Sequence, residues 1–218
     1  MADTAGARDF RSTRFEHTTP VGPAEVVLDL PEHPLSLLTL GHGAGGGVDA
    51  PDLLAVRDLV TSHGVAVARI TQPYRMAGRR APAPAKQLDT AWTATVVAVH
   101  VKGLASLPLI SGGRSSGARV ACRTAESVAA AGLVALAFPL HPPGKPDRSR
   151  ADELLTGRPT LVINGDRDPF GCPDPVDQAV VEVLSGGDHS LRKVADQAAA
   201  LVLAWLARHG WAQASQQP

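Results

Sequence analysis

Gly112-Gly113-Arg114-Ser115-Ser116-Gly117-Ala118-Arg119 contains the most informative pattern of this chain, a Gly-x-Ser-x-Gly pentad at 113–117. It follows the apolar run Leu107–Ile110 and precedes a segment with a helical pattern. A Gly-x-Ser-x-Gly pentad between a strand and a helix predicts a nucleophile elbow, a strained turn that lifts the serine hydroxyl out of the sheet. Because such a short pentad is common by chance, its meaning depends on whether the chain also supplies a base, an acid and an oxyanion hole.

Short apolar runs alternate with helical patterns along the chain, which is typical of a mostly parallel α/β sheet. Strands are expected at Glu25–Leu30, Leu35–Leu40, Val65–Ile70, Leu107–Ser111, Leu133–Phe138, Thr160–Asn164 and Val180–Leu184. The tight turn Pro31-Glu32-His33-Pro34 favours an antiparallel hairpin between the first two of these strands. Residues 1–20 and 211–218 are expected to be flexible tails on either side of a single domain spanning 21–210.

Helices are expected between the strands. Asp49, followed by Ala50 and Pro51, predicts the N-cap of one helix, which would end at His63-Gly64. Two further helices each present one apolar face at steps of three and four residues. Those faces consist of Leu88, Trp92, Val96 and Val99, and of Val194, Ala198, Leu201, Val202, Trp205 and Leu206.

Composition excludes several classes of function. The chain has 21 Lys and Arg residues against 21 Asp and Glu residues, and this zero net charge argues against nucleic acid or an anionic membrane as a partner. Cys122 and Cys172 match no metal-ligand or Cys-x-x-Cys spacing, although one disulfide between them stays open. No secretory signal is visible in residues 1–20, and the longest near-apolar run, Val128–Leu140, is too short to span a bilayer. We therefore expect a cytoplasmic enzyme or binding protein.

Two loops that follow late strands supply a candidate acid and a candidate base. Asp168 stands in Gly165-Asp166-Arg167-Asp168-Pro169 and is preferred to Asp166 because it lies further into the loop, ahead of a stiffening proline. His189 follows the last expected strand, from which an imidazole can reach back across the sheet edge to Ser115, and His141 is its main rival. A serine hydroxyl needs such an imidazole, together with a group that fixes the tautomer of the ring.

The chain order Ser115, Asp168, His189 is the order of α/β-hydrolases. The chain resembles a small α/β-hydrolase of the dienelactone-hydrolase-like branch. It also resembles the hydrolase-like domain of bacterial proteins and of a regulatory subunit of a eukaryotic chromatin acetyltransferase complex. The matching segments are GHGAGG (41–46), GGRSSGAR (112–119), NGDRDPFG (164–171) and GGDHSL (186–191). Dienelactone hydrolases use a cysteine nucleophile where this chain has Ser115, so lactone specificity is not carried over.

This resemblance implies an α/β-hydrolase fold with a mostly parallel sheet and helices on both faces. About twenty residues separate Phe138 from Thr160, which leaves no room for a cap domain. The oxyanion hole would use the backbone N–H groups of Ser116 and Ala44, with Gly45 as the fallback, because His42-Gly43-Ala44 resembles an oxyanion motif. His42 itself is expected to be a structural hydrogen-bonding group.

The loop Gly41-His42-Gly43-Ala44-Gly45-Gly46 also matches the dinucleotide fingerprint G-x-G-x-x-G. That alternative predicts an NADP-dependent oxidoreductase, in which Arg69 would suit a 2′-phosphate. The expected helix start at Asp49-Ala50-Pro51 comes several residues too late for that fingerprint, whose last glycine packs in the first turn of the helix. A non-catalytic interaction domain is a further alternative.

The preferred hypothesis is a serine esterase or thioesterase that acts on a small-molecule ester and uses no cofactor and no metal. Arg75, Arg79 and Arg80 lie in a proline-rich loop at residues 71–85. They would either favour an acidic substrate or form an ordinary solvated surface loop.

Overall fold

Eight strands form one mixed sheet in the computed structural model, which describes residues 10–214. The strands are β1 (Phe10–Thr19), β2 (Gly22–Pro31), β3 (Ser36–Gly41), β4 (Val65–Thr71), β5 (Leu109–Arg114), β6 (Gly132–Leu136), β7 (Thr160–Gly165) and β8 (Ala179–Leu184). Their order across the sheet is β1-β2-β4-β3-β5-β6-β7-β8. The pairings β1–β2 and β2–β4 are antiparallel, and all neighbours from β4 to β8 are parallel, so the predicted mostly parallel sheet is confirmed.

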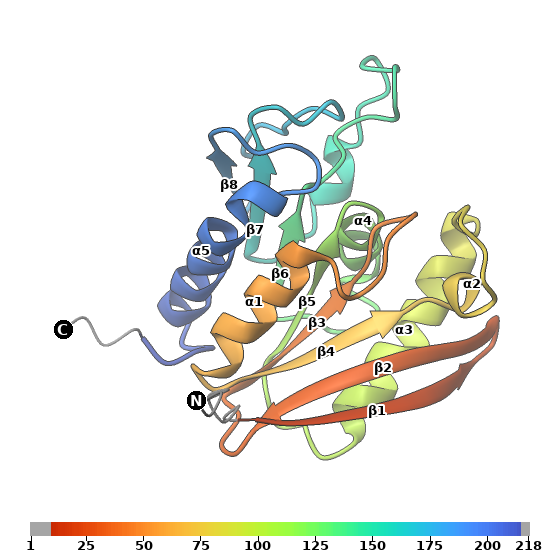
Figure 1. Ribbon diagram of the computed structural model, residues 1–218, viewed down its shortest axis with the longest axis vertical. Coiled ribbons are helices and arrows are strands. Elements are labelled where there is room, and N and C mark those ends of the chain that lie inside the picture. The colour runs from red at the N-terminus through yellow and green to blue at the C-terminus, as the bar shows by residue number, and fades with distance from the viewer. Residues whose placement is uncertain (1–9, 215–218) are drawn as a thin grey trace, which may run out of the picture.

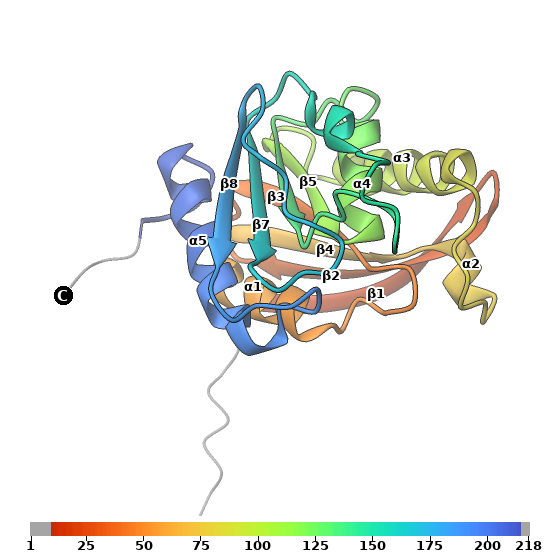
Figure 2. The same ribbon diagram turned by 90° about the horizontal axis from the view of Figure 1, so that it is seen from above.

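Helices cover both faces of this sheet, as the sequence predicted (Figures 1 and 2). They are α1 (Pro51–Thr61), α2 (Pro73–Met76), α3 (Ala85–Val101), α4 (Ser116–Thr124) and α5 (Ala195–Arg208), with short 3-10 helices η1 (Ala151–Leu154) and η2 (Arg192–Val194). Side chains alternate across a strand, so Leu38 and Leu40 of β3 pack toward α1 and α5, whereas Leu37 packs toward α3. One apolar core on each face of the sheet therefore fixes the strands whose carboxyl ends carry the candidate residues.

The predicted apolar helix faces are buried except for Leu201, which is partly buried, and Val194 of the predicted face lies in η2, just before α5. Leu88, Trp92, Val96 and Val99 are all buried in α3. In α5 the buried residues include Ala198, Val202, Trp205 and Leu206. The predicted cap of α1 is wrong, because Ala50 is the N-cap and Asp49 instead accepts a 2.6 Å hydrogen bond from the buried guanidinium of Arg69.

The expected flexible N-terminal tail is wrong over residues 10–20. These residues form β1, which pairs with the whole length of β2 from Phe10 opposite Pro31 to Thr19 opposite Gly22. Most side chains of β1 are exposed, so the strand has no apolar run that sequence analysis could detect. An antiparallel edge strand tolerates such composition because backbone hydrogen bonds hold it. Residues 1–9 of the expected tail lie outside the described residues.

The expected hairpin around Pro31–Pro34 is also wrong. β2 pairs with β1 and β4, whereas β3 lies on the far side of β4 and pairs with β4 and β5. The turn therefore carries the chain past one strand instead of joining two neighbours. A short turn is compatible with a β2–β3 hairpin and also with a connection that passes over β4. The insertion of β4 between β2 and β3 in the sheet determines which of the two forms.

The C-terminal tail begins later than expected. Trp211 packs edge-on against Trp205 and stacks on His209, and Ala212 is buried. The Gln213 N–H donates a 2.9 Å hydrogen bond to the His63 carbonyl. The predicted boundary at residue 210 is therefore too early, and residues 215–218 lie outside the described residues.

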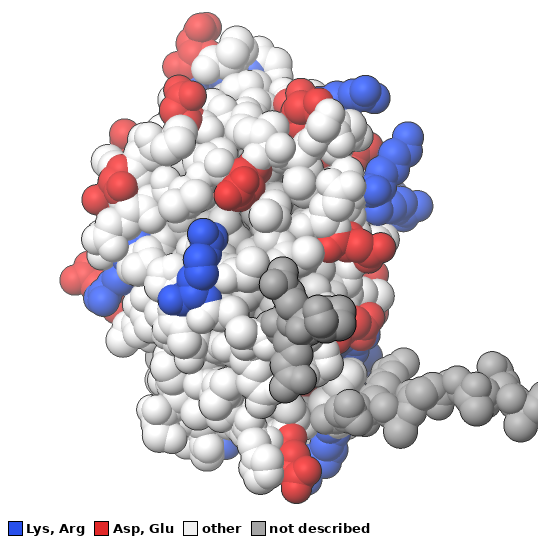
Figure 3. All heavy atoms as spheres, turned by 90° about the vertical axis from the view of Figure 1, so that its left-hand side faces the viewer, with Lys and Arg blue, Asp and Glu red and all other residues white. Residues whose placement is uncertain are grey.

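No cap domain interrupts the sheet over residues 10–214. The connection between β6 and β7 contains only the single-turn η1, which confirms the expectation of an uncapped fold. None of the helices in this part of the chain has the length and apolarity needed to cross a bilayer. On the face seen in Figure 3, acidic and basic side chains are interspersed and form no large patch of one sign.

Candidate active site

Ser115 sits in a sharp turn between β5 and α4. Its backbone has φ 52° and ψ −113°, a left-handed conformation that residues with a side chain rarely adopt. The Ser115 N–H donates a 2.9 Å hydrogen bond to the Leu136 carbonyl at the end of the neighbouring strand. The turn thus has the strained geometry that the pentad predicted, and strain of this kind persists only where the surroundings impose it.

Glycines make the turn possible because backbones cross there in contact. A Cβ placed on Gly113 would stand 2.5 Å from the Gly41 carbonyl oxygen, and one on Gly117 would overlap the same oxygen. Any side chain at either position would push β3 away from α4. The glycines of the pentad therefore hold the start of α4 directly against the end of β3.

The structure brings Ser115, His189 and Asp168 into one hydrogen-bonded chain. His189 Nε2 lies 2.8 Å from Ser115 Oγ, and His189 Nδ1 lies 2.8 Å from Asp168 Oδ2. An ionised carboxylate can only accept, so the Nδ1–H donates to Asp168 and leaves Nε2 free to accept the serine proton. The Asp168 carboxyl group is fully buried, and its other oxygen accepts the N–H of Phe170 at 2.9 Å. Phe170 packs its ring against the imidazole, with centroids 4.2 Å apart.

The two rivals for these positions lie elsewhere. Asp166 accepts hydrogen bonds from Ser185 Oγ at 3.2 Å and from the Gly186 N–H at 2.8 Å, so it ties together the loops after β7 and β8. His141 Nδ1 faces the Pro142 carbonyl at 3.0 Å. Neither side chain is bonded to Ser115 or His189 within residues 10–214, so the geometry agrees with the preferred assignments.

Hydrogen bonds in the loop after β3 orient the peptide group that carries the Ala44 N–H. The Gly43 carbonyl accepts from His42 Nδ1 at 2.8 Å and from the Gly46 N–H at 3.1 Å. The N–H of a trans peptide points opposite to its carbonyl, so these bonds fix the direction of the Ala44 N–H. In the described part of the chain neither this N–H nor that of Ser116 has a protein acceptor.

The side chains of His42 and Tyr74 stabilise this loop through hydrogen bonds. His42 Nε2 accepts the Gln72 N–H at 3.1 Å, and burial lowers the pKa of His42, so the ring is a neutral structural group as expected. Tyr74 donates its hydroxyl to the Ala44 carbonyl at 2.7 Å. Tyr74 lies in the proline-rich segment 71–85, and the one sequence feature that distinguishes it is that it is the single tyrosine of the chain.

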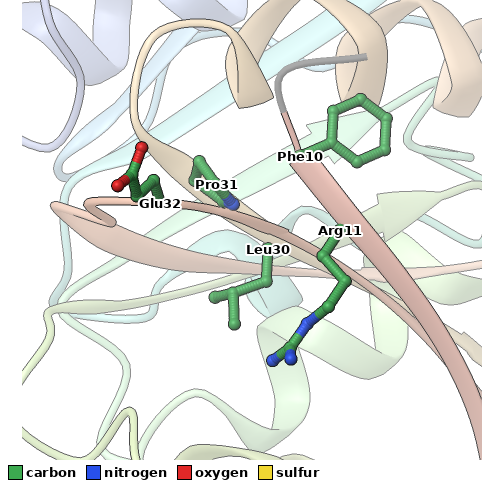
Figure 4. A pocket seen from close by; sticks show the side chains of 5 residues that line it. All are labelled: Phe10, Arg11, Leu30, Pro31 and Glu32. Carbon is green, nitrogen blue, oxygen red and sulfur yellow. The ribbon is translucent and has the colours of Figure 1, made fainter. Parts of the chain in front are cut away.

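A cavity of about 390 Å³ adjoins the serine turn. It is lined by Gly46, Gly47, Asp49, Ala50, Pro51, Arg114, Ser190 and Arg192. A second cavity, of about 410 Å³, lies at the end of the β1–β2 hairpin among Phe10, Arg11, Leu30, Pro31 and Glu32 (Figure 4). The first cavity is bordered by Arg114 and Ser190, the chain neighbours of Ser115 and His189, whereas no residue lining the second belongs to the loops around Ser115.

The dinucleotide alternative does not fit the loop after β3. Helix α1 begins at Pro51, so Gly46 lies outside it and cannot pack in its first turn. Arg69 is buried and bonded to Asp49, Asp29 and the Val48 carbonyl, which leaves it unavailable to a phosphate. Among residues 10–214 no group of three or more His, Cys, Asp or Glu side chains is arranged to hold a metal ion, and both cysteines are free.

The overall structure is similar to several solved hydrolases. A lidless α/β serine hydrolase from Xanthomonas campestris is 21% identical, with a TM-score of 0.74, over 94% of this chain and 97% of that one. A dienelactone hydrolase from Anabaena variabilis is 15% identical, with a TM-score of 0.75, over 92% and 98% of the two chains. The esterase domain of a Rhodothermus marinus protein is 15% identical, with a TM-score of 0.70, over 91% and 98%. At these identities the likeness shows the fold.

A search of curated proteins finds no match to this sequence. The family is shown instead by a family model, described as an alpha/beta hydrolase domain, which matches residues 34–205. This range contains the serine turn, both loops that carry Asp168 and His189, and the glycine-rich loop after β3. The chain therefore belongs to the α/β-hydrolase family.

Proposed function

We propose that this protein is a serine hydrolase that cleaves small esters or thioesters through an acyl-enzyme on Ser115. The observation that carries the proposal is the alignment of one imidazole between two partners. His189 Nε2 is 2.8 Å from Ser115 Oγ while its Nδ1 is 2.8 Å from the buried carboxylate of Asp168. A hydroxyl, a base in the accepting tautomer and an orienting acid are the parts that acyl transfer to serine requires.

In the first step Ser115 Oγ attacks the carbonyl carbon of the ester while His189 Nε2 takes the hydroxyl proton. The tetrahedral intermediate collapses as the imidazolium returns that proton to the leaving alcohol or thiol, and an acyl-serine remains. Water then attacks the acyl-serine, with His189 again accepting a proton and returning it to Ser115 Oγ. Asp168 stays ionised throughout and stabilises the imidazolium.

Negative charge on the tetrahedral oxygen is stabilised by the N–H groups of Ala44 and Ser116. Both N–H groups lack a protein acceptor in the described residues, and the Ala44 N–H is oriented by the bonds that its peptide carbonyl makes. A donor of this kind contributes about 3 kcal/mol to transition-state stabilisation.

Small substrates fit the open architecture of the site. No helical lid covers the serine in residues 10–214, and a cavity of about 390 Å³ borders its chain neighbour Arg114. Long lipids are normally bound under a cover that excludes water from their chains. The esterases among the structural neighbours, such as the Rhodothermus marinus domain, support ester cleavage as the reaction class.

A fluorophosphonate probe and p-nitrophenyl acetate test the proposal together. The wild-type protein is expected to be labelled at Ser115, as located by mass spectrometry of the labelled peptide, and to release p-nitrophenol. Ser115→Ala should abolish labelling and reduce turnover by at least about 10⁴-fold, because residual catalysis would come from binding and the oxyanion hole alone.

Ser185→Ala is the matched control. Ser185 is exposed on the same sheet edge, and within residues 10–214 its hydroxyl bonds only Asp166, so its loss should leave both readouts within twofold of wild type. Absence of labelling in the folded wild-type protein would contradict the proposal and favour a non-catalytic interaction domain. Labelling that persists in Ser115→Ala would move the nucleophile elsewhere.

A further inference from the structure

Arg114 occupies the variable position of the pentad immediately before Ser115, and its side chain extends to α1 and to the loop that carries His189. Its Nε donates to Asp52 Oδ2 at 2.8 Å, and its Nη2 donates to the backbone carbonyl of His189 at 2.7 Å. Its Nη1 lies beside Gly43, 2.8 Å from where a Cβ on that glycine would stand. The side chain is only 13% exposed. One guanidinium therefore contacts the first turn of α1, the loop that carries His189 and the loop after β3.

We propose that Arg114, anchored by Asp52, is a positioning residue that holds the His189 loop in register with Ser115. This inference rests on the proposed serine hydrolase function. It assigns to the pentad a second task beyond presenting the nucleophile, because the residue next to Ser115 also fixes the backbone of the base. Neither Arg114 nor Asp52 contacts the reacting atoms, so both act through His189.

Backbone hydrogen bonds hold the loop on either side of His189, where the Gly187 carbonyl accepts the Arg167 N–H at 2.9 Å and the Asp188 carbonyl accepts the Leu191 N–H at 3.0 Å. At His189 itself, the contact with Arg114 fixes the backbone. The loop follows β8, which is an edge strand whose Val180 and Val183 side chains are about half exposed. In the described residues the His189 carbonyl has Arg114 as its only hydrogen-bond donor. Leu191, two residues after His189, is in a left-handed conformation with φ 50°. Loss of the guanidinium would free this carbonyl and allow the imidazole to shift relative to Ser115.

Asp52 explains why the guanidinium stays in place. Its carboxyl group is fully buried in the first turn of α1, and burial raises its pKa while the Arg114 charge opposes that rise. A buried carboxylate without its partner is strongly unfavourable, so the pair is locked together. A guanidinium can donate to two acceptors in fixed directions at once, which the single ammonium of lysine cannot reproduce. The residue type is therefore as important as the charge.

A second arginine–carboxylate pair provides a matched control. Arg119 of α4 donates from both Nε and Nη2 to Glu153 of η1, and its side chain is 26% exposed. It carries the same chemistry and lies on the same helix–turn unit, but it makes no hydrogen bond to the loops of Asp168, His189 or Ala44. Removal of Arg119 tests the cost of losing an ion pair without disturbing the base.

The experiment compares Arg114→Gln, Arg114→Lys, Asp52→Asn and Arg119→Gln by kcat and KM for p-nitrophenyl acetate and by thermal melting. Arg114→Gln is expected to lower kcat about a hundredfold with KM changed less than about threefold, since a displacement of about 1 Å between reacting groups costs that much. Arg114→Lys and Asp52→Asn should each lower kcat about tenfold. Arg119→Gln should lower the melting temperature but leave kcat within twofold.

Chemical rescue separates positioning from general destabilisation. Millimolar guanidinium chloride is expected to restore part of the kcat of an Arg114→Gly variant, whereas the same concentration of sodium chloride or of urea should not. A folded Arg114→Gln protein with wild-type kcat would overturn the proposal, as would equal losses of kcat in Arg114→Gln and Arg119→Gln. If Arg114→Gln does not fold, wild-type kcat in Arg114→Lys would overturn it.

Failure of this inference is distinguishable from failure of the proposed function. Fluorophosphonate labelling of wild-type Ser115 establishes the hydrolase independently of any Arg114 variant. A labelled wild type with an unaffected Arg114→Gln variant contradicts only the positioning role. An unlabelled wild type contradicts the hydrolase itself.

Discussion

The crossing of β3, β5 and α4 and the hairpin of β1 and β2 bring backbones together by opposite means. At the crossing, Gly41, Gly113 and Gly117 approach so closely that no Cβ fits between them. In the hairpin, each residue of β1 lies opposite one of β2, alternate pairs exchange backbone hydrogen bonds, and most side chains of β1 extend into water. The crossing therefore restricts the residue types it can contain, whereas the hairpin accepts almost any polar residue. A region of the first kind is visible in a sequence, and one of the second kind is not.

Substitution of Gly117 by alanine should have the largest effect and would test the crossing directly. In an ordinary helix this change would stabilise the protein by about 1 kcal/mol. Here the added methyl group would overlap the Gly41 carbonyl oxygen, which is backbone and cannot rotate away. We expect the steric cost of about 1–3 kcal/mol to dominate and fluorophosphonate labelling to slow at least a hundredfold. An increase in melting temperature with unchanged labelling would contradict this account of the crossing.

Tyr74→Phe should have an intermediate effect, which we expect on catalysis at Ser115 and not on the β1–β2 hairpin. The Tyr74 hydroxyl holds the Ala44 carbonyl at 2.7 Å, and burial raises its pKa to about 12, so the donor stays protonated at neutral and mildly alkaline pH. Loss of a hydrogen bond worth about 1 kcal/mol predicts a kcat about fivefold lower with little change in KM. Because the hydroxyl does not titrate in that range, the ratio of the two kcat values should be constant between about pH 6 and pH 9. A ratio that changes with pH would contradict the role given to Tyr74.

Gly22→Ala in the hairpin is the counterpart of Gly117→Ala. Gly22 has φ 121°, but a Cβ there would meet only Pro73 at 3.4 Å, an ordinary contact. The cost is conformational strain of about 1 kcal/mol, which corresponds to a decrease in melting temperature of about 2–4 °C for a chain of this size. Esterase activity at 25 °C should remain within twofold of wild type. A large loss of activity would show that the hairpin influences the site after all.

Arg14→Gln should have the smallest effect. The Arg14 side chain is 62% exposed and pairs with Glu25 across the hairpin at 2.9 Å. Exposed pairs contribute at most about 1 kcal/mol, so urea denaturation should show a free energy of unfolding lowered by less than that amount. A decrease of several kcal/mol would mean that the hairpin is held by side chains as well as by its backbone.

Much of the fold and of the candidate site could be predicted from local patterns. Local motifs predict that the catalytic candidates lie at one sheet edge. These motifs are the pentad around Ser115 and the loops after β7 and β8, which carry Asp168 and His189 in that order. This worked because the carboxyl ends of parallel strands meet at one edge, so position along the chain predicts proximity in space. The preference for Asp168 over Asp166 also agrees with the observed contacts.

Other features could not be predicted because they depend on distant partners. The polar strand β1 has no apolar signal, and the turn at residues 31–34 is compatible with either neighbour of β4. Asp52 is separated from Arg114 by 62 positions, and nothing in either local sequence indicates that the two side chains meet. Pairings of this kind follow from the packing of α1 against the sheet edge, which no local pattern encodes.

The sequence by itself determined which residues occupy the sheet edge, because glycines, strand periods and loop positions follow from short-range sterics. The contacts that hold those residues depend on the packed fold: the bond from Arg114 to the His189 carbonyl, the ion pair of Arg114 with Asp52, and the bond from Tyr74 to the Ala44 carbonyl. Hydrogen-bond geometry over tenths of an ångström depends on the mutual placement of whole helices and strands, and that placement is set by the packed core.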